Sequence, residues 1–211
     1  MAGFPNAGGG AIVKAIAATI VENKAYLSEI DGKIGDGDHG VNMAKGFGRA
    51  SERIGDDASL QEGFATLSDV LMSEIGGSMG PLYGMFFMEM ADALEGVETI
   101  DGPAFAKMLR AGLEGVSSVG SANVGDKTMM DALVPAVEAA ETGAGGDFAE
   151  TLRAAKAAAE TGRDSTRDMA AKIGRASRLG ERSRGVLDAG ATSCAMIVGG
   201  LCDGAFARLA Q

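Results

Sequence analysis

Apolar residues recur at helical spacing along most of this chain, and no other feature limits its possible folds so strongly. In the first segment Ile12, Ile16, Ile20, Leu27 and Ile30 follow the period of an α-helix. Several later segments are rich in alanine, which has the highest helix propensity. The sequence shows no run of alternating β-branched residues and no alternation of strands with helices. It therefore predicts an all-α fold.

Glycine and aspartate separate the predicted helices. They occur together at residues 55–57, 101–103 and 142–147, where turns are expected. The first helix ends at Ile30 and is followed by an acidic loop that begins at Asp31. The further predicted helices span residues 41–54, 58–74, 81–95, 103–117, 127–142, 147–172 and 191–209. Together they predict a single domain over residues 1–211, a bundle or barrel of about eight antiparallel helices with polar, glycine-rich loops at its ends.

The chain is acidic, and this limits its ligands. It has 29 Asp and Glu residues against 19 Lys and Arg residues, which gives a net charge of −10. Such a charge repels a phosphate backbone, so nucleic-acid binding is not expected. A small anionic ligand would need local help from a metal ion or from backbone N–H groups.

Several features predict a soluble cytoplasmic protein. Cys194 and Cys202 lie in one apolar segment, and on a helix they would be roughly 12 Å apart, too far for a disulfide. Unpaired thiols are typical of a reducing compartment. The N-terminal sequence MAGFPNAGGG lacks the basic and apolar regions of a signal peptide. The longest uncharged runs, residues 75–88 and 189–202, are about 14 residues each, shorter than a membrane span.

The stretch IGDGDHG at residues 34–40 concentrates acidic side chains among glycines. Asp31, Asp36 and Asp38 fall within eight positions, and carboxylate oxygens are the ligands that Mg²⁺ prefers. An EF-hand is excluded, because with Asp36 as first ligand Phe47 would stand where the bidentate Glu belongs. Two interpretations stay open at this point, a site for divalent cations and an ordinary solvated turn.

His39, the only histidine of the chain, follows directly and opens a predicted helix. Backbone N–H groups and the positive dipole end at such a position attract phosphate, although a lone histidine is often structural. The loop IGGSMGPLYG at residues 75–84 offers similar N–H donors around Ser78, or else its glycines serve close helix packing.

Two later segments carry further candidate residues. GSANVGDKTMMDA at residues 120–132 resembles a phosphate-binding loop, but Asp126 interrupts the pattern and no buried strand precedes it. We interpret it as a helix start, with Asp126 or Thr128 near the cap and two methionines available to line an apolar pocket. In GRASRLGERSRGVLDAGATS at residues 174–193, four arginines would clamp phosphates or an acidic partner, or pair with the abundant carboxylates. These are Arg175, Arg178, Arg182 and Arg184.

Taken together, four stretches resemble one family, the nucleotide-binding L subunit (L domain) of dihydroxyacetone kinases. In order they are EIDGKIGDGDHGVNMAKGF, GGSMGPLYG, GDKTMMDALVPAVEA and GRASRLGERSRGVLDAGATS, and they span residues 29–193. The resemblance implies an all-α barrel of about eight antiparallel helices with the nucleotide at one end. Two positions depart from the family pattern. Ser78-Met79-Gly80 stands where Ala-Ser-Gly is common, and Asp188-Ala189-Gly190 stands where Asp-Pro-Gly is common.

The resemblance also implies roles for individual residues. Asp31, Asp36 and Asp38 would hold two Mg²⁺ ions that bridge the phosphates of ADP or ATP, and His39 would complete the catalytic set as a phosphate contact. The implied nucleotide contacts are His39, Gly40, Val41 and Asn42 at the start of the second helix, Ser78 and Met79 in the glycine loop, Gly120, Thr128 and Met129 beside the adenine, and Arg175, Asp188, Ala189 and Gly190 closing over the nucleotide.

The implied activity is phosphoryl transfer to a small ketose that a separate K subunit holds, because 211 residues leave no room for the K domain. The phosphoryl donor is either free ATP or a phosphocarrier protein of the phosphotransferase system that rephosphorylates bound ADP. Three alternatives are an ATP-exchanging subunit for a four-carbon ketose such as erythrulose, a nucleotide-sensing protein without catalysis, and a structural bundle.

Overall fold

The computed structural model describes residues 2–209, so Met1, Ala210 and Gln211 of the predicted domain lie outside the described residues. Over that range the chain forms nine α-helices and one two-stranded antiparallel ribbon, and it confirms the predicted all-α fold. The elements are β1 (Gly3–Pro5), α1 (Gly10–Glu22), α2 (Lys24–Ile34), α3 (His39–Arg53), α4 (Leu60–Glu74), α5 (Met79–Ala93), β2 (Thr99–Asp101), α6 (Gly102–Val119), α7 (Met130–Gly143), α8 (Phe148–Ser165), the 3-10 segments η1 (Thr166–Asp168) and η2 (Arg175–Ser183), and α9 (Ala189–Leu209).

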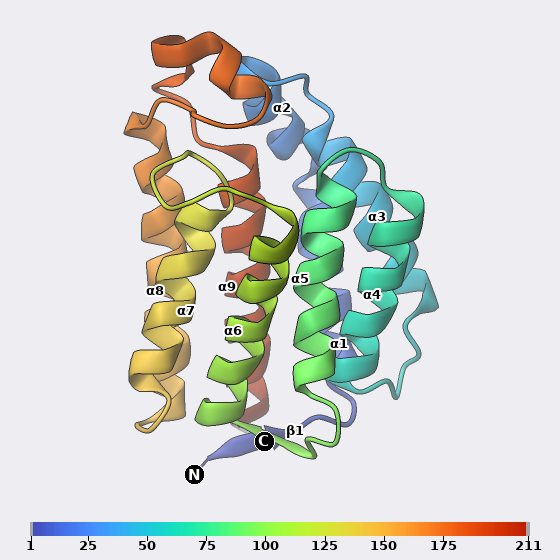
Figure 1. Cartoon of the computed structure of the whole chain (residues 1–211). Coiled ribbons are helices and arrows are strands. Elements are labelled where there is room, and N and C mark those ends of the chain that lie inside the picture. Colours follow the sequence, from blue (N-terminus) through green and yellow to red (C-terminus); the bar gives the residue numbers. More distant parts are fainter. Residues whose placement is uncertain (1, 210–211) are drawn as a thin grey trace.

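Eight helices stand side by side and close into a barrel (Figure 1). From α3 onward each long helix packs against the next in sequence, and α9 returns to pack against α1. The short α2 lies at one end against α3. Because neighbouring helices run in opposite directions, every second loop reaches the same end of the barrel.

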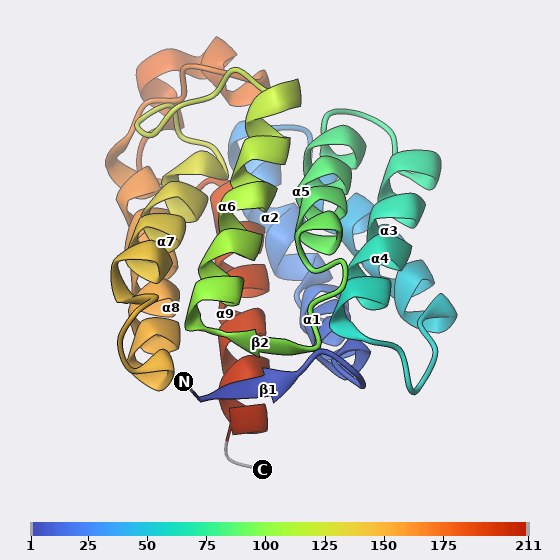
Figure 2. The same ribbon diagram turned by 60° about the horizontal axis from the view of Figure 1, so that its bottom comes forward.

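The two ends of the barrel differ in what covers them. At one end β1 pairs with β2 below the helices, and both described chain ends lie there (Figure 2). We call this the ribbon end. At the opposite end lie the loops 35–38, 75–78 and 120–129 and the connection 166–188 (Figure 1), and we call this the loop end.

The interior is filled by aliphatic and phenylalanine side chains, as the composition without tryptophan requires. Phe47, Phe64 and Phe86 surround Phe87, with ring centroids 4.9–5.8 Å apart, and all four are at most 1% exposed. Helix α9 is long and apolar enough to cross a membrane by length and composition alone. However, 67% of its apolar stretch is buried inside the protein, which is typical of a core helix. Its two cysteines are both buried and unpaired, as predicted.

The structure corrects four of the predicted boundaries. The first predicted helix is two helices, because the Asn23 side chain donates to the Thr19 carbonyl (2.8 Å) and interrupts the regular pattern. The second of these helices continues to Ile34, past the predicted end at Ile30, so Asp31 lies inside α2 rather than in the acidic loop. The helix predicted to reach residue 172 ends at Ser165, where the chain turns into η1. The three-residue strands were not predicted, because they are too short to show alternation.

The start of α7 is also corrected, from residue 127 to Met130. The buried Asp131 carboxylate accepts the N–H groups of Gly125 (2.5 Å) and Thr128 (2.7 Å) and holds residues 125–128 as a turn. The N-cap is Met129, without a side-chain cap, although the Thr128 hydroxyl accepts the Met130 N–H (3.2 Å). Both methionines at this helix start are at most 6% exposed and belong to the core rather than to an open pocket.

Candidate functional site

All four sequence stretches with candidate residues meet at the loop end (Figure 1). The aspartate loop joins α2 to α3, the glycine loop joins α4 to α5, and residues 120–129 join α6 to α7. The arginine-rich connection joins α8 to α9 and contacts α2 through η2. The fold therefore brings together segments that are up to 150 residues apart in the sequence.

The aspartate loop is organised by its own backbone. The Asp38 N–H donates to the Asp36 carboxylate (3.4 Å), and the next N–H, of His39, donates to the Asp31 carboxylate (3.3 Å). Two consecutive amide groups thus orient two carboxylates from different elements toward the start of α3. Asp36 also forms an ion pair with Arg175 of η2.

This arrangement fits a divalent cation, although no ready-made ligand set is present. Among residues 2–209, no three His, Cys, Asp or Glu side chains converge closely enough to form a metal-ligand group. The Arg175 guanidinium instead lies against Asp36, so a positive charge already stands at the position where the donor chemistry favours one. Oxygen donors on a short loop are the ligands that Mg²⁺ takes. The metal roles of Asp31, Asp36 and Asp38 stay predictions.

Glycine is required at two positions in and beside the aspartate loop, at one by the backbone conformation and at the other by close packing. Gly37 has φ +79°, in the left-handed region that glycine adopts without strain. At Gly40 a Cβ atom would lie 2.1 Å from the Lys24 carbonyl oxygen, because α2 and α3 cross closely there. Glycine is therefore needed at position 40 for helix packing, whether or not this residue also contacts a nucleotide as we predicted.

His39 is fixed by a hydrogen-bond chain that reaches into the core. Its Nε2 atom lies 2.9 Å from Ser193 Oγ on α9, and Ser193 Oγ lies 2.7 Å from the hydroxyl of Tyr83 on α5. Ser193 is fully buried and Tyr83 is 2% exposed. Burial lowers the pKa of His39 to about 4, so the imidazole is neutral at pH 7. Sequence analysis missed Ser193 and Tyr83. They lie on α9 and α5, far from His39 in the sequence, and their spacing gives no sign that these helices meet in the fold.

The glycine loop before α5 is open. Gly76, Gly77 and Ser78 are exposed, and a Cβ atom at either glycine would meet no atom within 4 Å. Ser78 is the N-cap of α5 but makes no side-chain cap hydrogen bond. Met79 behind it is partly buried against the core. The hydroxyl and the first N–H groups of α5 thus point to no partner within the described chain.

The predicted adenine contacts lie near the start of α9. A Cβ atom on Gly190 would lie 3.4 Å from the Met129 nitrogen and 3.0 Å from the Asp188 carboxylate. Asp188 accepts the Ala191 N–H (2.7 Å) at the start of α9, and burial raises its pKa to about 7. The structure therefore brings the segment 188–190 next to Met129. Gly120, the C-cap of α6, lies at the beginning of the same loop.

The four arginines differ in their contacts. Arg175 meets Asp36, and Arg184 pairs with Glu181 (2.5 Å) and donates to the Asp168 carbonyl. Arg178 and Arg182 are exposed and have no ion-pair partner among residues 2–209. Sequence analysis treated the four alike and overlooked Lys127, which is buried at the centre of this connection.

The fold and the site define a class of protein, an all-α barrel whose aspartate, glycine and arginine loops gather at one end. Residues 33–203 match the sequence profile described as the DAK2 domain, so the chain belongs to the DAK2-domain family. This confirms the resemblance that the sequence motifs indicated.

Named relatives agree with this assignment. The chain is 40% identical over 180 residues to the ADP-binding subunit DhaL of PEP-dependent dihydroxyacetone kinase 1 from Listeria innocua, with 84% of this chain and 86% of the relative covered. It is 41% identical over 172 residues to the ADP-binding subunit DhaL of the PEP-dependent dihydroxyacetone kinase from Escherichia coli, with 80% and 82% covered.

A solved structure shows the same fold. The crystal structure of the dihydroxyacetone kinase from C. freundii in complex with AMP-PNP and Mg²⁺ superposes with a TM-score of 0.69 at 28% identity. The match covers 92% of this chain and 33% of that one. The chain thus spans about a third of the length of that kinase.

Proposed function

We propose that this chain is the Mg²⁺-dependent ADP- or ATP-binding subunit of a dihydroxyacetone-type kinase, with residues 1–211 as one L-type domain. The names of its relatives support the kinase assignment and the nucleotide. The AMP-PNP and Mg²⁺ of the related crystal structure support the metal. In this proposal the protein acts in the cytoplasm and transfers a phosphoryl group to a small ketose.

One observation carries the proposal most directly. The helices α3, α5 and α7 all begin at the loop end, and none has a side-chain hydrogen bond at its N-cap. The first N–H groups of a helix have no intrahelical partner and carry its positive dipole end, so they bind phosphate well. At α7 the Met130 N–H already donates to the Thr128 hydroxyl, so the starts of α3 and α5 are the ones that offer donors for phosphate oxygens, beside the acceptors that the aspartate loop offers a cation.

The chemistry that these residues perform is mostly positioning. Phosphoryl transfer needs the donor held in line and its charge neutralised. Bound Mg²⁺ would supply charge neutralisation, and Asp31, Asp36 and Asp38 would hold it. The Gly40, Val41 and Asn42 backbone at the start of α3 would orient phosphate oxygens. His39 is neutral and held by Ser193, which suits a hydrogen-bond contact to phosphate rather than a phospho-carrier role.

The substrate side of the reaction would come from a partner. We propose a separate K-type subunit that holds the ketose, because relatives that this chain covers to more than 80% are named ADP-binding subunits of their kinases. Seven of the eight large hydrophobic side chains that are exposed in residues 2–209 belong to loops or helix turns at the loop end, as the bounds of their elements show. Apolar side chains that gather on one face mark a surface for another protein. The seven are Val21, Tyr26, Val41, Met72, Val119, Val124 and Ile173.

The phosphoryl donor and the ketose are the finer parts of this proposal. The relatives named PEP-dependent favour a phosphocarrier protein that rephosphorylates bound ADP. Native mass spectrometry after dialysis tests this choice: retained ADP supports the phosphocarrier route, and ready loss supports exchange with free ATP. Dihydroxyacetone and a four-carbon ketose such as erythrulose can be compared in the same reconstituted assay.

The proposal as a whole is tested by thermal unfolding with ADP and Mg²⁺ together and separately. A specific site stabilises the protein by RT ln(1 + [L]/Kd), so the melting temperature should rise with ADP concentration only when Mg²⁺ is present. No shift would contradict the proposal. Mixing with a K subunit, ketose and either donor then separates a kinase subunit from a nucleotide sensor, since a sensor would yield no ketose phosphate.

A further inference from the structure

Lys127 combines two unusual features. It is 2% exposed, although lysine is rarely buried, and its φ of +63° makes it the one non-glycine residue with positive φ in the described chain. A side chain in that backbone region costs roughly 1 kcal/mol relative to ordinary conformations. The Asp131 carboxylate enforces the turn by accepting the N–H groups of Gly125 and Thr128 on either side of Lys127. The turn directs the lysine side chain back into the protein.

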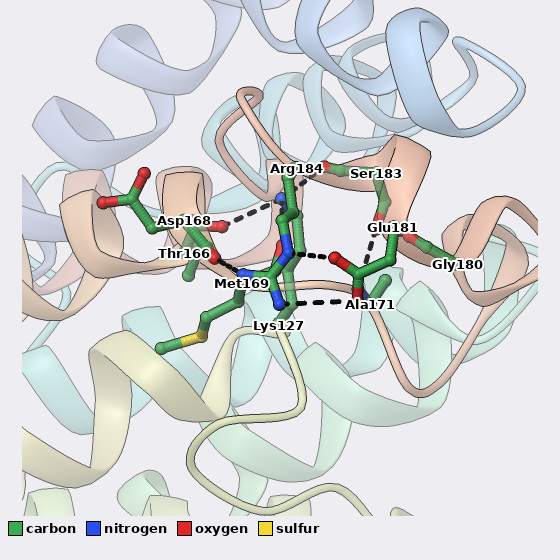
Figure 3. Close-up of polar contacts among 9 residues, drawn as sticks. All are labelled: Lys127, Thr166, Asp168, Met169, Ala171, Gly180, Glu181, Ser183 and Arg184. Carbon is green, nitrogen blue, oxygen red and sulfur yellow. Dashed lines mark hydrogen bonds and ion pairs between the residues drawn. The ribbon is translucent and has the colours of Figure 1, made fainter.

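The Lys127 ammonium group is bound by four backbone carbonyls. Three of them belong to Thr166, Met169 and Ser183, which Figure 3 shows around the lysine. Its Nζ atom lies 2.8 Å from the Thr166 oxygen, 3.2 Å from that of Met169, 2.7 Å from that of Ser183 and 2.6 Å from that of Val186. An ammonium has three protons and no acceptor, whereas a neutral amine would turn a lone pair toward a carbonyl. Four acceptors around one nitrogen therefore select the charged form. Burial lowers the pKa of Lys127, and the nearby Asp188 carboxylate opposes that shift.

These carbonyls belong to both arms of the connection 166–186. Thr166 and Met169 lie on the outgoing arm, and Ser183 and Val186 lie on the returning arm. Three further contacts join the arms: the Gly185 N–H donates to the Arg167 carbonyl (2.7 Å), the Ala171 N–H donates to the Ser183 hydroxyl (2.8 Å), and the Arg184 guanidinium donates to the Asp168 carbonyl. Most other residues of the connection are exposed, so it has little core of its own. The ammonium stands where the two arms close.

The same connection carries residues of the proposed site. Arg175, between the two arms, reaches the Asp36 carboxylate, and Asp188 follows the returning arm directly. The Asp188 N–H donates to the Thr166 hydroxyl (3.0 Å), next to the carbonyl that binds Lys127. Lys127 is thus linked to Asp188 through Thr166, and Arg175 lies in the segment between the two arms that the ammonium joins.

We propose that Lys127 is a positioning residue, whose ammonium closes the connection 166–186 by its four carbonyls and so holds Arg175 and Asp188 in place over a bound nucleotide. It contacts no ligand itself. This inference rests on the proposed function for its effect on the nucleotide, but its effect on the connection can be measured without any ligand. If the side chain only packed in the interior, its methylene groups would be sufficient, whereas closing the connection requires the charged ammonium group.

The test compares Lys127→Met, which keeps the apolar stem, with Lys127→Arg, which keeps the charge. Lys156→Met is the matched control, because Lys156 pairs with Asp203 on the barrel wall between α8 and α9. Hydrogen exchange of the ligand-free proteins, followed by mass spectrometry, should show residues 166–187 of Lys127→Met exchanging at least ~tenfold faster, with the core helices unchanged. Lys127→Arg should recover part of that protection, and Lys156→Met should match the wild type.

The second measurement is the dissociation rate of Mg²⁺-ADP. We expect it to rise at least ~tenfold in Lys127→Met and less in Lys127→Arg, in parallel with the exchange data. Wild-type exchange in Lys127→Met would overturn the inference, as would unchanged nucleotide dissociation or unfolding of the whole protein. If the wild type binds no Mg²⁺-ADP, the proposed function fails, while the ligand-free exchange still decides whether Lys127 closes the connection.

Discussion

The two ends of the barrel differ in whether side chains accept the first N–H groups of the helices that begin there. Three of the four helices that begin at the ribbon end have side-chain caps: Ser59 accepts the Glu62 N–H, Asp101 accepts the Ala104 N–H, and Asp147 accepts the Glu150 N–H. The fourth, α1, begins after Gly9 without one. At the loop end the Asp188 carboxylate accepts the Ala191 N–H at the start of α9, but α3, α5 and α7, which also begin there, have no such cap. Since an N-cap contributes about 1 kcal/mol, the chain leaves stability unused at the loop end. Free helix starts are what a phosphate-binding site requires.

The ribbon end is also tied together by contacts that leave little room for movement. Arg208 donates to the carbonyls of Ala7 (2.7 Å) and Gly8 (3.1 Å), and its guanidinium lies over the Phe4 ring. Phe4 in turn stacks on Phe148. At the loop end the contacts run between loops, as in the ion pair of Arg175 with Asp36 and the hydrogen bonds of Lys127 to the connection between α8 and α9. We infer that the ribbon end contributes more to the stability of the fold, whereas the loop end is arranged to bind a ligand.

The largest expected difference between the ends concerns the acidic residues. Asp36→Asn should weaken Mg²⁺-nucleotide binding by at least ~100-fold, because in the proposed site it removes a charged metal ligand, a larger loss than the 10–100-fold of a supporting residue. Stability should change by less than about 0.5 kcal/mol, since a loop carboxylate supports no core. Isothermal titration with Mg²⁺-ADP and urea denaturation measure the two effects.

Asp56→Asn is the matched control, because it makes the same charge change at the ribbon end. Asp56 is exposed and pairs only with Lys14 at the surface (2.7 Å). An exposed ion pair contributes little, so neither nucleotide affinity nor stability should change measurably. Equal affinity in both variants would show that the aspartate loop holds no metal. Unfolding of Asp36→Asn, with metal-free wild type folded, would give the loop a structural role instead.

The capping residues give a second and smaller contrast. Ser59→Ala should destabilise the protein by about 1 kcal/mol, because it breaks the capping box of α4, and should leave nucleotide binding unchanged. Ser78→Ala should do the reverse: a change below about 0.5 kcal/mol in stability, and a severalfold loss of affinity equivalent to about 1 kcal/mol for one hydrogen bond. Denaturation and titration of the same two variants give all four values.

The outcome at Ser78 also tests a departure from the family pattern, in which the serine usually stands one position later. If Ser78→Ala binds nucleotide as tightly as the wild type, the hydroxyl is not a phosphate contact in this chain. If it loses as much stability as Ser59→Ala, the serine caps α5 and the contrast between the two ends fails at that helix.

Much of this contrast was predictable from local sequence. Helical periodicity predicted eight helical segments, of which the first is divided in two at Asn23, and Gly-Asp clusters placed most turns, because both signals depend on neighbouring residues. Asp31, Asp36 and Asp38 were recognised as a group because they lie within eight positions. The break at Asn23 was missed, since it depends on a side chain that bonds four residues back rather than on the apolar pattern.

The parts that were missed depend on contacts across the fold. Ser193 lies 154 positions from His39, and the Lys127 carbonyl partners lie 39 to 59 positions away. The motif GDKT drew attention to Lys127 only as part of a phosphate-binding loop that was then rejected. A lysine that binds backbone carbonyls leaves no pattern in the sequence, because any residue supplies a carbonyl.

The smallest expected contrast is in the response to acid. Burial lowers the pKa of His39 from 6.5 to about 4, so the unfolded chain binds more protons than the folded one between these values. His39 therefore adds no penalty above pH 6.5, and stability falls as the pH drops from there toward 4. By pH 5 the loss should be about 1 kcal/mol after allowance for partial exposure. Hydrogen exchange at pH 7.5 and pH 5, corrected for intrinsic rates, should show opening near the start of α3 before the ribbon end.

His39→Gln provides the control, because glutamine hydrogen-bonds but does not titrate. Asp188 acts in the opposite direction, since its raised pKa of about 7 makes the folded state gain stability as the pH falls. Wild type and His39→Gln are therefore compared with each other at each pH, because the contribution of Asp188 is common to both. Between pH 7.5 and pH 5 the wild type should lose about 1 kcal/mol more of its free energy of unfolding than His39→Gln does. As the only histidine, His39 also gives a single set of imidazole NMR signals, which should keep their neutral positions down to about pH 5. A midpoint near 6.5 would mean that the imidazole is solvated, and the loop end would then be no more sensitive to acid than the ribbon end.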